Sequence, residues 1–239
     1  AAYMKTPCMP SNVQSSVFIK LNADGSATLA TGAIEMGQGT YTALAQITAE
    51  ALDIPFEKIN VTNKVDTLIS PYEWQTVASH TTWGTGNAIL LAAKDLKRKL
   101  KEAAALVFDA KPENVLLEGD KLYFKDRVLK WSDIALGYRN PDGSALTTPV
   151  MGEGHFVAKG VQNPDPTFGC VGVELGIDKT TGEVHLYRLL NTIDAGTIIN
   201  PQIARDQVLG AMTMVLGSTL SEGLVFSEDR GNIRNDNLV

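Results

Sequence analysis

The chain has 239 residues, of which 44% are hydrophobic and 20% are charged, and its formal net charge at pH 7 is −6. This composition is ordinary for a globular protein, and the length allows one large domain or two lobes that share a core. We expect a cytoplasmic protein that binds neither membrane nor nucleic acid, because there is no apolar run of about 18 residues, no signal-peptide pattern and no basic stripe.

The two cysteines do not indicate a metal site or a disulfide. Cys8 and Cys170 lie far apart, and neither belongs to a Cys-x-x-Cys pair, which argues against a disulfide framework and against a zinc site. An iron–sulfur cluster needs four thiolates, so this chain alone cannot hold one. We interpret both cysteines as buried or incidental thiols and expect no metal ligand from the protein.

Near the N-terminus the sequence predicts a hairpin. Residues 16–21 alternate between apolar and polar side chains, residues 22–25 are turn formers, and residues 27–31 return as a second strand. Residues 58–63 then predict a further short strand.

Two helices and a long loop are predicted around these strands. After a Gly-Gln-Gly segment, apolar residues recur at helical spacing, and Thr40 or Thr42 can cap the start of this helix. Residues 68–87 are rich in turn formers and hydroxyl groups and lack any period, so they predict a long ordered loop. Residues 88–108 predict the clearest helix, with a lysine-rich solvated face over residues 94–101.

The second half of the chain predicts strands followed by a helix. Residues 118–126 carry a hairpin signal, and residues 138–156 predict a loop or a lobe boundary. Two long strands joined by a turn are expected over residues 169–194. A long apolar helix follows, with Asn200 as its cap and Pro201 at its first position.

This mixture of helices and strands has no regular βαβ alternation. The predicted class is therefore α+β, with mixed sheets packed with helices. We expect two lobes, residues 1–150 and residues 151–239.

The segment Gly37-Gln38-Gly39 precedes a predicted helix and is the first candidate site. Glycines let a ligand approach the main chain, and the helix N-terminus favours an anion. The alternative is a tight turn with a surface glutamine. Thr42 replaces the third glycine of the dinucleotide fingerprint, and no P-loop exists, so NAD, FAD and ATP sites are excluded on motif grounds. Adjacent Glu35 could be catalytic, but we favour a buried, hydrogen-bonded role.

Residues 77–82 form the second candidate site, because small and hydroxyl residues in a loop can offer several donors to phosphate oxygens. His80 could contact a ligand or be structural. Ser79 beside His80 is not a triad, since adjacent side chains seldom face each other and no Gly-x-Ser-x-Gly motif exists. His155 and His185 lack metal-ligand spacing, so we expect structural roles for both.

The third candidate site is the turn and helix start within residues 194–211, where Asn200 and Gln207 carry amide side chains. Three helix starts rich in amide or hydroxyl groups suggest one polyphosphate-like ligand held between the lobes.

Three long segments, in this order, resemble the molybdenum hydroxylase family, which includes xanthine dehydrogenases and aldehyde oxidoreductases. Residues 35–61 resemble the family's second Gly-Gln-Gly segment and its following helix. Residues 66–89 are similar to its Asp-Thr…Pro…Ala-Ser…Gly-Asn-Ala segment, and residues 174–212 to its strand pair, Asn-Pro turn and Gln-x-x-Gly helix. The resemblance runs from about residue 11 to the end and points to the second molybdopterin-binding region of the large subunit.

The resemblance implies a molybdenum ion on a pterin dithiolene, usually extended by a cytosine nucleotide in bacterial members. Family enzymes hydroxylate an aldehyde or an N-heterocycle such as a purine with oxygen from water. Electrons then pass to 2Fe-2S clusters and usually FAD, expected here on partner domains or subunits. The dithiolene supplies sulfur to the metal, so no protein ligand is required.

By position, the resemblance implies three groups of cofactor-binding residues. The first would contact the pterin or the oxygen ligands of the metal, the second the phosphates or the pterin, and the third would line the nucleotide and pterin channel. These groups are Met36, Gly37, Gln38 and Gly39; Ala78, Ser79, His80, Thr81 and Thr82; and Asn200 and Gln207.

The chain also departs from the family pattern. The family's catalytic glutamate lies in a Gly-x-Gly-Glu motif, which we expect beyond Val239, and neither Glu222 nor Glu228 has that context. The upstream lobe with its Gly-Gly-Phe-Gly loop and substrate-binding arginine is also missing. Asp206 stands where the family usually has glycine, and its charge would weaken a phosphate contact at Gln207.

We therefore expect a fragment that lacks a catalytic residue of its own and is inactive in isolation. Its expected partners are the remaining molybdenum subunit, iron–sulfur and flavin subunits or domains, and a small-molecule substrate. Two alternatives are a non-catalytic scaffold or assembly domain that retains the fold, and an unrelated phosphate-binding module.

Overall fold

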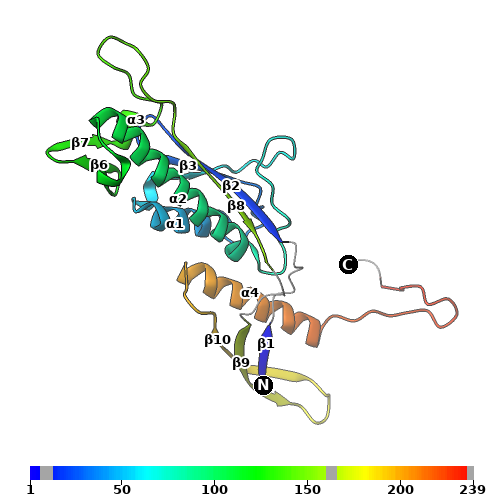
Figure 1. Ribbon diagram of the computed structural model, residues 1–239. Coiled ribbons are helices and arrows are strands. Elements are labelled where there is room, and N and C mark those ends of the chain that lie inside the picture. Colours follow the sequence, from blue (N-terminus) through cyan, green and yellow to red (C-terminus); the bar gives the residue numbers. More distant parts are fainter. Residues whose placement is uncertain (6–12, 160–165, 236–239) are drawn as a thin grey trace.

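The computed structural model describes residues 1–5, 13–159 and 166–235, and it confirms the predicted α+β class (Figure 1). Its helices and strands follow one another in the order β1 Ala2–Lys5, β2 Gln14–Leu21, β3 Ala27–Thr31, α1 Thr40–Leu52, β4 Ile59–Val61, α2 Thr81–Phe108, β5 Leu116–Glu118, β6 Lys121–Phe124, β7 Arg127–Lys130, α3 Trp131–Ile134, β8 Met151–Val157, β9 Thr167–Ile177, β10 Val184–Asp194 and α4 Pro201–Leu220. Short 3-10 helices occupy Phe56–Lys58 and Pro112–Asn114.

The main core lies between a four-stranded sheet, in the order β4-β3-β2-β8, and the helices α1 and α2. Strand β2 is antiparallel to β3 and β8, and β3 is parallel to β4. Alternate residues of β2, Val17, Ile19 and Leu21, are buried, and they share the core with Leu96 and Leu100 of α2. Burying each such side chain contributes roughly 1.5–3 kcal/mol, so this face fixes the register of β2.

Strand β8 lies directly against α2, and glycines make this approach possible. A Cβ atom at Gly154 would overlap the carbonyl oxygen of Ala88, and one at Gly152 would overlap that of Ala92. Side chains at these two positions would therefore push the sheet away from the helix.

A second, smaller sheet of β5, β6 and β7 packs near the C-terminal end of α2. Leu122 of β6, Trp131 of α3 and Phe108 of α2 are all buried there. The ring of Phe108 stacks on that of Phe124, with 5.9 Å between centroids. This sheet extends the core away from the candidate site.

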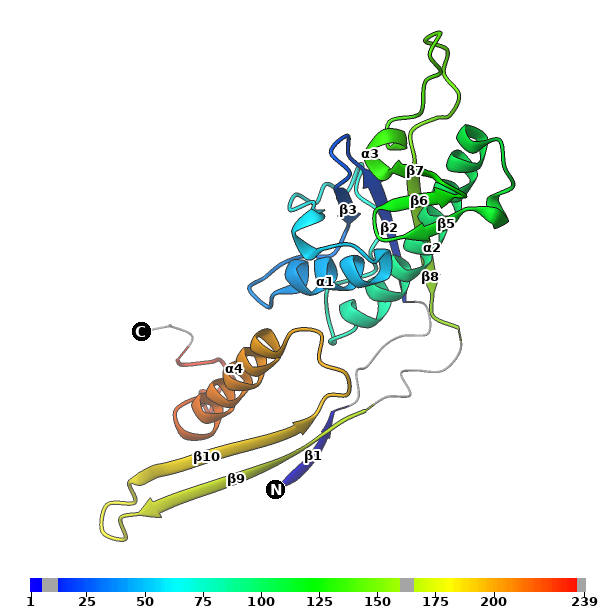
Figure 2. The same cartoon turned by 90° about the vertical axis from the view of Figure 1, so that its left-hand side faces the viewer.

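The third sheet, in the order β1-β9-β10, and helix α4 have a different character. Strands β9 and β10 form a long antiparallel hairpin, and β1 pairs with the other edge of β9. Figure 2 shows this hairpin projecting away from the main sheet, with α4 above it. No residue between 166 and 235 is buried, although this stretch contains a 20-residue helix rich in apolar side chains.

Most predicted elements are confirmed. The N-terminal hairpin, the short strand at β4, the hairpin in residues 118–126 and the long strand pair all form. Residues 138–150 are irregular as predicted, but the rest of that segment forms strand β8. Helix α4 begins at Pro201 with the side chain of Asn200 as its cap, as expected.

Two details of the prediction are wrong. Helix α1 has Gly39 as its cap residue, in the left-handed conformation, and no threonine side chain caps it; Thr40 is already helical. Helix α2 begins at Thr81, so the predicted loop over residues 68–87 ends seven residues too late. The start of α2 lacks an apolar period because small or polar residues are buried there. A Cβ atom at Gly84 would be 2.8 Å from Ser15 Oγ, and the hydroxyl of buried Thr85 donates to Glu73 Oε2 at 2.8 Å.

The lobe boundary at residues 150 and 151 stays a prediction. The strand pairings suggest a refinement, since β8 pairs with β2 and β1 pairs with β9. We propose that the lobes follow the sheets, with residues 151–157 in the first lobe and residues 1–5 in the second. Within the described ranges, none of the helices has the length and apolar character needed to cross a membrane.

Candidate functional site

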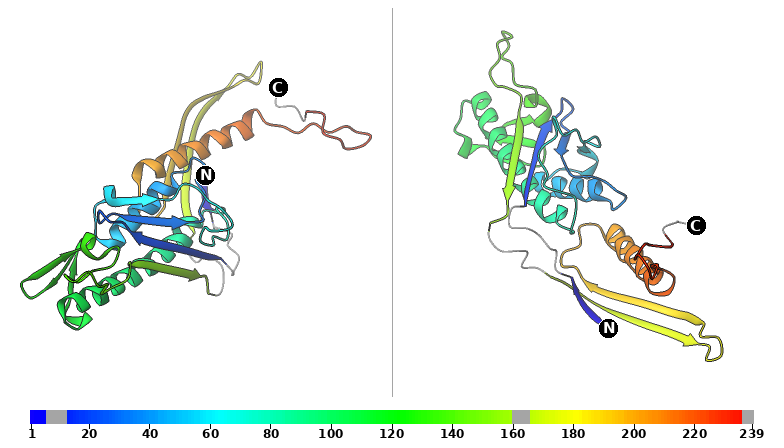
Figure 3. Two further views of the ribbon diagram at one scale, coloured as in Figure 1. Left: turned by 90° about the horizontal axis from the view of Figure 1, so that it is seen from above. Right: turned by 90° about the vertical axis from the view of Figure 1, so that its right-hand side faces the viewer.

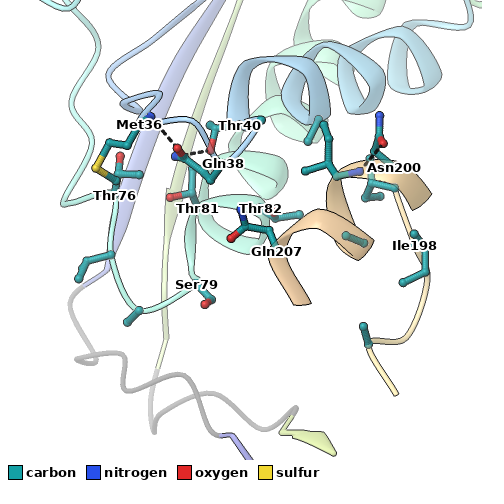
Figure 4. Close-up of a pocket in the computed structure, with 18 of the residues that line it drawn as sticks. Met36, Gln38, Thr40, Thr76, Ser79, Thr81, Thr82, Ile198, Asn200 and Gln207 are labelled. Atoms are coloured by element: carbon teal, nitrogen blue, oxygen red, sulfur yellow. Dashed lines mark hydrogen bonds between the residues drawn. The ribbon is translucent and has the colours of Figure 1, made fainter. Parts of the chain in front are cut away.

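The starts of helices α1, α2 and α4 meet at one cleft of about 470 Å³. Three segments far apart in the sequence form its walls, residues 36–43, 76–82 and 195–207 (Figure 4). Viewed from above in Figure 3, α4 begins next to α1 and then extends away from it. The sequence predicted three such helix starts, and the structure brings them together.

The Gly-Gln-Gly loop is held in shape by the side chain of Gln38. Its Oε1 accepts from the backbone N–H of Met36 at 2.6 Å, and its Nε2 donates to Ile34 O and Thr40 Oγ1, both at 2.8 Å. Gly37 and Gly39 have φ angles of 99° and 78°, which favour glycine. Since both N–H bonds of Nε2 are used within the loop, only Oε1 retains capacity to bind a further donor.

Glu35 satisfies the N–H groups at the start of α1. Its Oε1 accepts from Gly37 N at 2.8 Å and from Gly39 N at 2.9 Å, and its Oε2 accepts from Tyr41 N at 3.1 Å. Partial burial acts to raise the pKa of Glu35, but the hydrogen bonds from the backbone outweigh it and lower the pKa below the usual 4.5. The predicted hydrogen-bonded role is confirmed, although the residue is only half-buried.

The second wall is a strained turn that leads into α2. Ala78 and Ser79 have φ angles of 53° and 59°, in the left-handed region that L residues seldom adopt. No side chain caps α2. Within the part of the chain that the structure describes, the backbone N–H groups of Thr81 and Thr82 have no acceptor. This helix start therefore keeps donors and the positive end of its dipole available to a ligand.

His80 takes no part in the cleft. Its side chain is fully buried, and its ring packs against Trp74 with 5.5 Å between centroids. Its backbone N–H donates to Val77 O at 3.2 Å. Burial lowers the pKa of His80, so the ring is neutral at neutral pH. The position of His80 therefore supports a structural role.

The third wall is the segment before α4 together with the first two turns of that helix. Asn200 Oδ1 accepts from Ile203 N at 3.0 Å, and its Nδ2 donates to Gln46 Oε1 of α1 at 3.0 Å. Ile203 lies so close to Gly39 that a Cβ atom there would be 2.6 Å from Ile203 Cδ1. Gln207 extends from α4 toward Gln38 and Thr82 in Figure 4.

Nine of the eleven expected cofactor-binding residues line this cleft, and two do not. The nine are Met36, Gln38, Gly39, Ala78, Ser79, Thr81, Thr82, Asn200 and Gln207. Gly37 is exposed beside the cleft, and His80 is buried behind it. Asp206 is not among the lining residues, and its effect on a phosphate contact at Gln207 stays a prediction.

Sequence reasoning missed Thr76 and Ile203. Thr76 Oγ1 accepts from Ile34 N at 2.9 Å and so joins the second wall to the glycine loop. No local pattern marks this residue. Ile203 lies within the predicted apolar helix, but its contact with Gly39, far away in the sequence, leaves no local signal.

Among the residues that the structure describes, the lining contains no Asp, Glu, Lys, Arg or His. Its electrostatic character therefore comes from backbone N–H groups, hydroxyls and amides, which suit a ligand with phosphate or polar heterocyclic groups. Among the described residues there is no cluster of three or more His, Cys, Asp or Glu that could hold a metal ion. Cys170 is exposed on β9 rather than buried, and Cys8 lies outside the described residues.

A protein-family model described as a molybdopterin cofactor-binding domain matches residues 1–239. The xanthine dehydrogenase molybdenum-binding subunit of Escherichia coli O157:H7 is 31% identical over 225 residues, which cover 92% of this chain and 29% of that protein. The aldehyde oxidoreductase molybdenum-binding subunit PaoC of Escherichia coli (strain K12) is 31% identical over 227 residues, which cover 95% of this chain and 29% of that protein.

The fold is also found in a solved structure. Reconstituted CO dehydrogenase from Oligotropha carboxidovorans superposes with a TM-score of 0.79 at 24% identity, over 98% of this chain and 30% of that chain. The chain thus spans less than a third of the length of the relatives that it matches.

Proposed function

This chain belongs to the molybdopterin cofactor-binding domain family, and we propose that the cleft between α1, α2 and α4 holds the pterin cofactor of a molybdenum hydroxylase. The observation that carries this proposal is the convergence of three helix starts on one cleft, whose described lining residues include no carboxylate. A ligand that combines phosphates with a polar heterocycle fits such a donor set.

We assign the two kinds of ligand group to different walls. The uncapped start of α2 would hold a phosphate through the N–H groups of Thr81 and Thr82 and the hydroxyl of Ser79. The glycine loop would receive the pterin, for which Gln38 Oε1 offers an acceptor. Gln207 would contact the ligand from α4. Asn200 would act mainly by holding the start of α4 beside α1, because one N–H and one lone pair of its amide are used within the protein.

The proposed activity is oxidative hydroxylation of an N-heterocycle or an aldehyde with oxygen from water. Its support is that relatives over 92% or more of the chain are named as molybdenum-binding subunits of xanthine dehydrogenase and aldehyde oxidoreductase. When bound, the cofactor would supply the redox chemistry of molybdenum. The residues of this chain bind and orient it, while the general base would lie in another part of the enzyme. We also propose a cytosine dinucleotide form of the cofactor, 2Fe-2S and FAD on partners, and a cytoplasmic location.

The apolar surface of the second lobe supports the proposed partner, the remaining part of the molybdenum subunit. Its large exposed side chains include Phe168, Val173, Leu175, Ile193, Leu209, Met214 and Val215. Exposed apolar patches of this kind mark interaction sites, and no residue in 166–235 is buried. The relatives are more than three times as long as the matched segment, so they have chain available to cover it.

The function is tested by assaying the full-length protein for molybdenum by mass spectrometry and for pterin by fluorescence after denaturation. We expect both in the native protein, and a clear loss in Gln38→Ala. Gln202→Ala is a matched control, because Gln202 is exposed on α4, makes no side-chain hydrogen bond among the described residues and does not line the cleft.

The absence of molybdenum and pterin from the native protein would contradict the proposed function. Normal cofactor content and turnover in Gln38→Ala would contradict only the role of Gln38. A full-length protein that holds the cofactor but does not turn over would favour the scaffold alternative.

A further inference from the structure

The three helix starts at the cleft differ in how their N–H groups are satisfied. At α4 the neutral side chain of Asn200 accepts from Ile203 N. At α2 no side chain does so. At α1 a full negative charge is present, because Glu35 accepts from three backbone N–H groups. Only α1 already holds an anion of its own.

We propose that Glu35 is a positioning residue that acts as a built-in anion at the start of α1. Its carboxylate holds the Gly-Gln-Gly loop in the shape that Gln38 completes, and it excludes phosphate groups from this end of the cleft. The proposal rests on the proposed function and deepens it, because it determines which part of a phosphate-bearing ligand can lie at each wall.

The geometry of the carboxylate supports this role. Both oxygens are used, one by Gly37 and Gly39 and the other by Tyr41, at 2.8–3.1 Å. An incoming phosphate would meet a like charge and would have to displace Glu35 before reaching these N–H groups. An uncharged heterocycle meets neither obstacle. At α2 the situation is reversed, since a phosphate there meets donors and no carboxylate.

The same geometry argues against Glu35 as a general base. A base must accept a proton from a reacting group, and three of about four lone-pair sites of the Glu35 carboxylate already accept from the backbone. These bonds also lower the pKa of Glu35, which makes its carboxylate a weaker proton acceptor. The residue therefore acts through the loop that it holds.

The test is hydrogen–deuterium exchange of the full chain, measured by mass spectrometry on peptides that cover residues 35–43 and 77–84. Glu35→Gln preserves the size of the side chain but replaces one acceptor oxygen with an N–H₂ group, which cannot bond a backbone N–H. We expect the amides of residues 37–41 to exchange about tenfold faster in this variant. Glu50→Gln is the matched control, because Glu50 lies exposed on α1 and makes no side-chain hydrogen bond among the described residues.

A second measurement compares the native chain with Glu35→Gln and uses inorganic pyrophosphate as the probe. In the native chain we expect pyrophosphate to slow exchange in residues 77–84 and to leave residues 37–41 unchanged. In Glu35→Gln we expect it to slow exchange at both places. Protection of residues 37–41 by pyrophosphate in the native chain would overturn the proposal, and so would unchanged exchange in Glu35→Gln.

These exchange experiments test the role of Glu35 separately from the proposed function. If the full-length protein lacks molybdenum and pterin, the function fails, yet faster exchange in Glu35→Gln would still establish the role of Glu35 in the loop. If the cofactor is present and exchange is unchanged, only the role of Glu35 fails.

Discussion

The side-chain amide of Asn200 donates to Gln46 Oε1 at 3.0 Å and so joins the start of α4 to α1 across 154 positions of sequence. The oxygen of the same amide caps α4 by accepting from Ile203 N. One residue thus fixes both the beginning of α4 and its place beside α1. Because α4 has no buried residue of its own, such polar links carry unusual weight in forming the cleft.

This link can be measured by a double-mutant cycle. Asn200→Ala removes the cap and the bond to Gln46, and we expect a loss of about 1 kcal/mol for the cap and ~0.5–1.5 kcal/mol for the bond. Gln46→Ala should lose only the ~0.5–1.5 kcal/mol of the hydrogen bond. The double variant should be no less stable than Asn200→Ala in urea unfolding. Strict additivity of the two single changes would show that the bond contributes nothing.

The contact between Gly39 and Ile203 predicts different effects for two neighbouring glycines. Gly37→Ala and Gly39→Ala both place a side chain at a positive φ, which costs about 1 kcal/mol or more. A Cβ atom at position 37 meets nothing within 4 Å, whereas one at position 39 collides with Ile203. We expect Gly39→Ala to lose a further ~1–3 kcal/mol and to weaken cofactor retention.

Shortening the opposing side chain supplies the control. In the Gly39→Ala background, Ile203→Ala should restore part of the lost cofactor content, because it removes the colliding atoms. Equal effects of Gly37→Ala and Gly39→Ala on stability and retention would mean that the contact does not matter.

Glu73, behind the cleft, predicts a dependence of stability on pH. Burial raises its pKa above 4.5, and the hydroxyls of Thr85 and Ser15, at 2.8 and 3.0 Å, oppose this only in part. The pKa of Glu73 is therefore higher in the folded protein than in the unfolded chain. The stability that its protonated form contributes is complete below the unfolded-state pKa and is lost as pH rises through the folded-state pKa. Glu73→Gln cannot ionise, so we expect it to be at least as stable as the native chain at neutral pH.

Denaturant unfolding over a range of pH checks this prediction. The stability of the native chain relative to Glu73→Gln should fall as pH rises above 4.5. Glu73→Ala, which leaves both hydroxyls without their acceptor, should be less stable than the native chain throughout. A constant difference between the native chain and Glu73→Gln would exclude a raised pKa.

Glu35 predicts the opposite dependence of stability on pH. Its folded-state pKa lies below 4.5, so its contribution to stability is present above the unfolded value and is lost as pH falls through the folded one. Relative to Glu35→Gln, the native chain should therefore lose stability on acidification. A gain in that range would be incompatible with the three backbone bonds to its carboxylate.

Local patterns predicted most of the fold, because most elements carry their own signal. The alternation of β2 and the Asn-Pro start of α4 each reflect contacts that are near in sequence. The start of α2 was missed because Gly84 and Thr85 are buried against segments that are distant in sequence. Such packing produces no local hydrophobic period.

The candidate site was predictable in its location and not in its internal bonding. The residue types marked where helix starts meet, and the cleft lies there. Sequence reasoning treated Gln38 and Asn200 as ligand contacts, yet Gln38 uses three and Asn200 two of about four side-chain hydrogen-bonding sites within the protein. The partners Ile34 and Gln46 are ordinary in the sequence, so only the fold could identify them.

The order of the three walls along the chain also determines when the cleft becomes complete. Its walls come from residues 36–43, 76–82 and 195–207, so a growing chain that has reached only residue 82 has two walls and lacks the third. The site is complete only after α4 has left the ribosome and Asn200 has met Gln46. Loading of a ligand at this cleft would therefore have to follow synthesis of all three segments, and it would report that this region has folded.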